Sequence, residues 1–106
     1  MRAWIAIGLF SIVATTSVVG AQGYPAKPVR AVVPFAPGGA TDIVTRIVAQ
    51  RLTEAWGQTV VVDNRAGAGG NIGADIVAKA VPDGYTLLMT SGSIVTANPH
   101  MYRKMP

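Results

Sequence analysis

The sequence has no cysteine among its 106 residues, which excludes a disulfide framework, a thiolate metal site and a cysteine nucleophile. Charged residues make up only 13% of the chain, whereas half of it is hydrophobic. This balance excludes a disordered chain. The nine lysines and arginines stand singly except for the doublet Arg103-Lys104. Nucleic-acid binders gather such residues on one face, so we predict no nucleic-acid partner.

Residues able to carry catalysis are also few. His100 is the only histidine, and we interpret it as a solvated loop residue. Ser91 and Ser93 lack the Gly-x-Ser-x-Gly frame of a serine nucleophile and have no visible base. The phosphate-binding P-loop pattern is absent as well. We therefore predict no catalytic residue, no cofactor and no metal site.

The N-terminal segment has the features of an export signal. Met1-Arg2 supplies a positive charge, Ala3–Val13 is almost entirely apolar, and the segment ends in Val19-Gly20-Ala21. Small residues at the last and third-last positions suit signal peptidase. The apolar run of about eleven residues is short of the ~20 that a membrane span needs. We predict a signal peptide over residues 1–21, cleavage after Ala21 and a periplasmic mature chain, residues 22–106.

The mature chain alternates strand and helix patterns. Val29–Pro34 and Thr59–Asp63 are β-rich apolar runs, and the second lacks alternation, as in a strand covered on both faces. Between them, apolar residues at 43, 44, 47, 48, 52 and 55 predict an amphipathic helix from Thr41 that Gly57 ends. A second helix over Asn71–Ala80 and a third strand over Tyr85–Thr90 follow, while Ile94–Pro106 is ambiguous.

This order predicts an α/β fold, a βαβαβ unit with parallel strands. Ligands bind such sheets beyond the carboxyl ends of the strands. Three loops lie there: Phe35–Ala40, Asn64–Gly70 and Ser91–Ser93. They offer backbone N–H groups and hydroxyls rather than catalytic side chains.

The first of these loops has two interpretations. Glycines and a helix start favour an anion such as a carboxylate, held by the N–H groups of Gly38 and Gly39. A side chain at Gly39 would then block the ligand and strain the turn. In the other interpretation the glycines only turn the chain, and Thr41 or Asp42 caps the helix.

The glycine pattern Gly67–Gly73, which begins in the second loop, invites a dinucleotide interpretation but fails the strict glycine spacing. We favour a tight connection capped by Asn71.

Three motifs together carry a family resemblance: PFAPGGATD (residues 34–42), NRAGAGGNIGA (64–74) and PDGYTLL (82–88). With them the chain resembles the Bug-type periplasmic receptors of tripartite tricarboxylate transporters. The resemblance implies the first lobe of a type II periplasmic-binding-protein-like fold, a small carboxylated solute and delivery to membrane permease subunits. The solute would be a di- or tricarboxylate, an amino acid or an aromatic acid. Matched by motif, the implied ligand residues are Phe35, Ala36, Pro37, Gly38, Gly39, Thr41, Asp42, Ser91, Gly92 and Ser93.

Members of that family are roughly three times longer, so the resemblance also implies a truncated N-terminal part of the first lobe that could not enclose a solute alone. Two other functions stay open from the residues. One is a small exported protein-interaction domain, and the other is an exported nucleotide or phosphoester enzyme domain.

Overall fold

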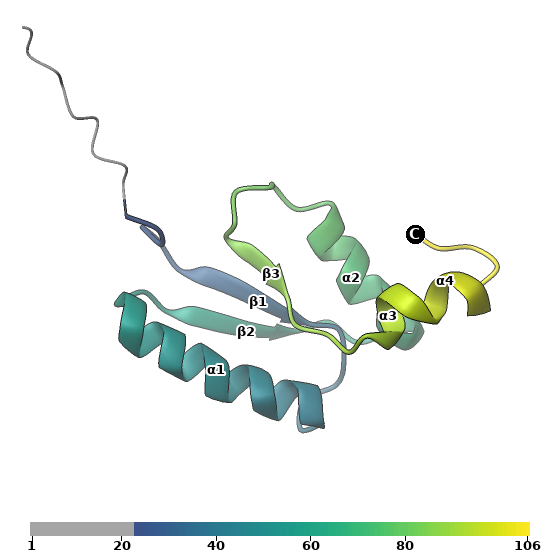
Figure 1. The fold of residues 1–106 in the computed structure, drawn as a ribbon, viewed down its shortest axis with the longest axis horizontal. Helices are drawn as coiled ribbons and strands as arrows, with labels where there is room; N and C mark the ends of the chain where they lie inside the picture. The colour runs from purple at the N-terminus through teal and green to yellow at the C-terminus, as the bar shows by residue number, and fades with distance from the viewer. Residues whose placement is uncertain (1–22) are drawn as a thin grey trace, which may run out of the picture.

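A three-stranded parallel sheet forms the centre of the structure (Figure 1). The computed structural model describes residues 23–106, so the predicted signal peptide lies outside the described residues. The strand order is β2-β1-β3, with β1 paired to both neighbours in parallel. The strands are β1 (Val29–Val33), β2 (Val60–Asn64) and β3 (Thr86–Leu88). The predicted βαβαβ order with parallel strands is confirmed.

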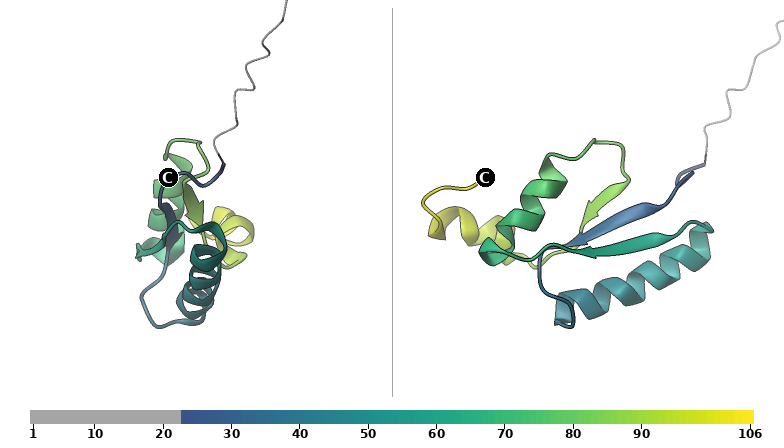
Figure 2. Two further views of the ribbon diagram at one scale, coloured as in Figure 1. Left: turned by 90° about the vertical axis from the view of Figure 1, so that its left-hand side faces the viewer. Right: turned by 180° about the vertical axis from the view of Figure 1, so that it is seen from behind.

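Two helices make the crossovers and lie on opposite faces of the sheet (Figure 2). Helix α1 (Ala40–Trp56) packs against β2 and β1, and α2 (Asn71–Ala78) packs against β3 and β1. A 3-10 turn, η1 (Ala68–Gly70), precedes α2. Because both faces of β1 are covered, Val29, Val32 and Val33 are completely buried.

Helix α1 presents an unexpected side to the sheet. Its buried residues are Asp42, Thr45 and Ala49, whereas Ile43, Val44 and Ile47 of the predicted apolar stripe are 52–59% exposed. The small Thr45 and Ala49 side chains allow a close approach, and the Thr45 hydroxyl donates to the Thr41 carbonyl, 2.6 Å away. The helix is where the periodicity predicts it, ending at Gly57 with φ 69°, but much of its apolar stripe faces outward.

Strand β2 and helix α2 also differ from expectation. Val61 is 49% exposed because α2 covers β3 and β1 and leaves that face of β2 open. The prediction that this strand is covered on both faces is therefore wrong. Helix α2 buries Asn71 and Gly73, while Ile72 of its predicted apolar stripe is half exposed.

The region that the sequence left ambiguous forms two short helices, α3 (Ser93–Thr96) and α4 (Asn98–Met101). Ile94 anchors α3 and is 4% exposed. Among residues 23–106, no helix combines the length and apolar character needed to cross a membrane.

An aromatic cluster closes the end of the sheet where the strands begin. The ring of Tyr24 lies 5.8 Å from that of Trp56 and 5.1 Å from that of Tyr85. The Lys27 ammonium lies 4.6 Å from the centre of the Tyr85 ring, and the backbone N–H of Ala26 donates to the Tyr85 hydroxyl. These contacts attach the extended segment before β1 to the ends of α1 and β3.

Candidate functional site

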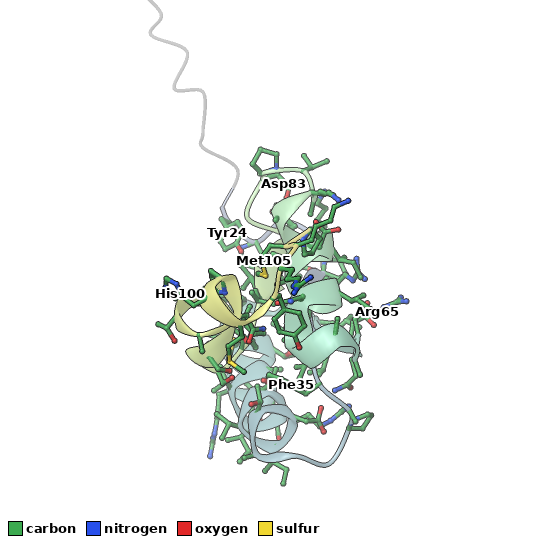
Figure 3. All side chains as sticks on the ribbon, turned by 90° about the vertical axis from the view of Figure 1, so that its right-hand side faces the viewer. Tyr24, Phe35, Arg65, Asp83, His100 and Met105 are labelled. Carbon is green, nitrogen blue, oxygen red and sulfur yellow. The ribbon has the colours of Figure 1, made fainter. Side chains whose placement is uncertain are left out.

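The candidate site is a shallow depression at the carboxyl ends of β1 and β3. Its volume is about 190 Å³. Figure 3 shows Phe35 near this end of the molecule, away from Tyr24 and Asp83. The lining residues come from the β1–α1 loop, the first turn of α1 and the segment after β3; they are Phe35, Gly39, Ala40, Thr41, Asp42 and Ser91. The fold thus brings together the first and third of the predicted ligand loops.

The start of α1 contributes backbone donors to this depression. Gly39 is the N-cap, in an extended conformation, and no side chain caps the helix there. The N–H groups of the first turn have no acceptor within the helix, and the helix dipole makes this end partly positive. Gly39, Ala40 and Thr41 all line the depression. This is an arrangement of donors that suits an anion.

Gly38 has a different role from the one predicted. Its backbone N–H donates to Asp42 Oδ2, 2.9 Å away, so it is not directed at a solute as the loop sequence predicts. Gly38 has φ +93°, whereas Gly39 has φ −78°. A side chain at Gly39 would therefore not strain the turn, and this part of the prediction is wrong.

Asp42 is the centre of a hydrogen-bond network. It is 3% exposed and accepts from Gly38, from Asn64 Nδ2 at 3.0 Å and from Arg46 Nε at 3.1 Å. The Gly38 N–H first, then Asn64 and Arg46, lower the pKa of Asp42 to about 2. Asp42 is thus ionised at neutral pH, and Arg46 balances its charge.

Asn64 and Arg46 are the site residues that sequence reasoning missed. Asn64, the last residue of β2, also donates to the Phe35 carbonyl at 3.2 Å and accepts from Arg46 Nη2 at 3.1 Å. The sequence contains a feature that could have identified each of these two residues. Arg46 lies four residues after Asp42, the spacing of a helical ion pair, and Asn64 ends a strand whose carboxyl end meets the first loop in a parallel sheet.

The remaining predicted ligand residues lie beside the depression rather than in its lining. Ala36 and Pro37 are exposed in the first loop. Ser93 begins α3 after Gly92, and its Oγ lies 2.8 Å from Ser91 Oγ. The hydroxyl of Ser91 is therefore oriented by a neighbour at the rim.

The second predicted loop is filled by side chains of the protein. A Cβ at Gly70 would meet the Ile94 side chain, and one at Gly69 would meet the Tyr102 hydroxyl. The expected cap at Asn71 is wrong, because Gly70 is the N-cap of α2. Asn71 Oδ1 instead accepts from Asn98 Nδ2 at 2.8 Å, and the same Nδ2 donates to the Gly69 carbonyl. This loop is a packing element that holds α4.

Two other groups of polar residues lie outside the depression. His100 is exposed on α4 (Figure 3). Burial alone raises the pKa of Asp63, but hydrogen bonds from Arg30 and Arg65 outweigh it and leave that pKa below its usual range. Within residues 23–106, no three His, Cys, Asp or Glu side chains gather in a way that could hold a metal ion.

A family comparison identifies the lineage. The model described as tripartite tricarboxylate transporter family receptor, TctC, matches residues 44–106. The chain belongs to this receptor family. BugT of Bordetella pertussis is 52% identical over 90 residues, which are 82% of this chain and 27% of BugT. The family resemblance drawn from the three motifs is confirmed.

Solved TctC-type structures share the fold. An R. palustris protein determined with adipate has a TM-score of 0.75 and 46% identity, over 77% of this chain and 27% of its own. MatC of Rhodopseudomonas palustris, with bound malate, has a TM-score of 0.59 and 45% identity, over 61% of this chain and 22% of its own. The chain thus spans about a quarter of the length of the relatives it matches.

Proposed function

We propose that this chain provides one wall of a periplasmic receptor that binds a small carboxylate solute for a tripartite tricarboxylate transporter. The observation that carries the proposal is the depression at the start of α1, which is lined by Gly39, Ala40 and Thr41 of the uncapped helix start and by Ser91. Donors of this kind bind a carboxylate without a salt bridge, since each hydrogen bond to a charged group contributes ~1.5–3 kcal/mol.

The solute class follows from the relatives and the site chemistry together. Adipate and malate, found with two related structures, are both dicarboxylates. One carboxylate of such a solute would occupy the depression, with Gly39, Ala40 and Thr41 as backbone donors and Phe35 as an apolar wall. Membrane permease subunits are the proposed recipients, and no step of this function needs a catalytic group.

A chimera tests the proposal, because MatC supplies a known solute. Residues 23–106 replace the matching segment of MatC, and calorimetric titration with malate measures affinity. We expect the chimera to bind malate and Gly39→Val to weaken binding at least ~10-fold, equivalent to 1.4 kcal/mol.

The control for this experiment is Gly23→Val, since a Cβ at Gly23 meets nothing within 4 Å. A folded chimera that binds no malate would contradict the receptor proposal. A folded Gly39→Val chimera with unchanged affinity would place the carboxylate elsewhere.

A further inference from the structure

The Asp42 carboxylate presents a problem for an anion site, because it belongs to the lining of the depression that should receive a carboxylate. The negative charge of Asp42 would repel the carboxylate of a solute bound there. In the structure this negative charge is compensated. Both carboxylate oxygens of Asp42 accept hydrogen bonds, and Arg46 pairs with them.

The partners of Asp42 belong to separate elements. Gly38 is in the β1–α1 loop, Asn64 ends β2, and Asp42 itself is in the first turn of α1. Asn64 also donates to the Phe35 carbonyl at the start of the same loop. The loop is therefore fixed at both ends, Phe35 through Asn64 and Gly38 through Asp42.

We infer that Asp42 is a positioning residue of the proposed solute site rather than a solute ligand. Its buried carboxylate takes up the Gly38 N–H and the Asn64 amide, which fixes the loop and leaves the N–H groups of Gly39, Ala40 and Thr41 for the solute. Arg46 cancels the charge that would otherwise repel the solute. This inference rests on the proposed function of the depression.

The direction in which Asp42→Asn changes the affinity for an anion separates the possible roles of Asp42. Asp42→Asn removes a negative charge, so a role through charge alone predicts tighter binding of an anion. A positioning role predicts weaker binding, because one amide oxygen cannot serve Gly38, Asn64 and Arg46 together. A direct contact with a solute hydroxyl predicts a larger loss for malate than for succinate, which lacks that hydroxyl.

The test uses the MatC chimera that carries residues 23–106, labelled for NMR, with succinate and malate as probes. In Asp42→Asn we expect the Gly38 amide to exchange at least ~10-fold faster, and succinate and malate affinities, followed at Gly39 and Thr41, to fall by the same factor of at least ~3. Asn64→Ala should shift both readouts in the same direction without changing the charge of Asp42.

The matched control is Asp75→Asn, since Asp75 also pairs with a cation four residues later, Lys79, but on α2. It should change neither readout. The swap Asp42→Asn with Asn64→Asp restores an acceptor for Gly38 and the bond between positions 42 and 64, so it should recover part of the Gly38 protection.

Each outcome decides something different. Unchanged Gly38 exchange, or tighter succinate binding, in Asp42→Asn overturns the positioning role. A loss confined to malate makes Asp42 a solute ligand. A parent chimera whose Gly38 protection depends on Asp42, but which binds neither acid, supports the loop fixation and contradicts the proposed solute site.

Discussion

Gly73 of α2 lies directly against Pro34 at the end of β1. A Cβ at Gly73 would come 2.6 Å from Pro34 Cβ and 2.9 Å from the carbonyl oxygen of Arg65. Both neighbours are ring or backbone atoms that cannot rotate away. The contact sets how closely α2 approaches the central strand, just beyond which the ligand loop begins.

The first prediction follows from that contact. Gly73→Ala should lower the free energy of unfolding by ~1–3 kcal/mol, the usual cost of overpacking. Urea unfolding followed by circular dichroism measures it. Gly92→Ala is the control, because its Cβ meets nothing within 4 Å and its φ is −61°. Equal midpoints for the two variants would show that α2 shifts without cost.

The two adjacent glycines of the first loop should respond differently to alanine. Gly38→Ala should cost ~1–2 kcal/mol of stability, because φ +93° is unfavourable for a residue with a Cβ. Gly39→Ala should stay within ~0.5 kcal/mol of the parent, since its backbone is extended and the nearest atom to a Cβ is 3.9 Å away. Parallel urea titrations check the pair, and a reversed order would contradict the loop conformation.

The hydrogen-bond network of Asp42 should persist down to low pH. The pKa of Asp42 is lowered from 3.8 to about 2, so the stability that its ionised form contributes is present above pH 4 and is lost as the pH falls through about 2. The carboxyl carbon shift of Asp42, followed by NMR from pH 6 to 1.5, measures the midpoint. Asn64→Ala removes one cause of the shift and should move the midpoint upward; an unchanged midpoint would argue against the hydrogen bond.

The outward face of α1 should promote self-association. Ile43, Val44 and Ile47 are each more than half exposed, and contiguous apolar surface of this kind favours association. We expect sedimentation of the purified chain to show concentration-dependent association and a shallow urea transition. Ile47→Lys should reduce the association; a monomer with a steep transition would contradict the prediction.

Export should remove residues 1–21. N-terminal sequencing of protein recovered from the periplasm should begin at Gln22, because Val19-Gly20-Ala21 suits signal peptidase. An intact Met1 in the membrane fraction would contradict the prediction.

The sequence predicts the order and type of the main elements because local signals and global packing agree there. Val29–Val33, the helix ended by Gly57 and the parallel connections all follow from apolar patterning and glycine positions. The side of α1 that faces the sheet could not be predicted in this way. Periodicity identifies an apolar stripe but not its partner, and small residues at 45 and 49 decided the close contact.

For the site, the sequence predicts where the loops lie but not which hydrogen bonds they form. Parallel topology predicts that the three strand-end loops lie at one end of the sheet, and Thr41 of the first loop region and Ser91 of the third both line the depression there. The occupation of the Gly38 N–H by Asp42 depends on the path of the turn, which residue types alone do not determine. Asn71 shows the same limit: its partner, Asn98, is 27 residues away.

The aromatic cluster at the other end of the sheet provides an intrinsic fluorescence probe. The sequence has two tryptophans, Trp4 and Trp56, and only Trp56 remains once residues 1–21 are removed. It lies at the far end of α1, ~24 Å along the helix axis from Ala40, with Tyr24 close enough to pass on excitation energy. Its fluorescence should therefore change when the segment before β1 docks or detaches. It should stay unchanged when a solute enters the depression.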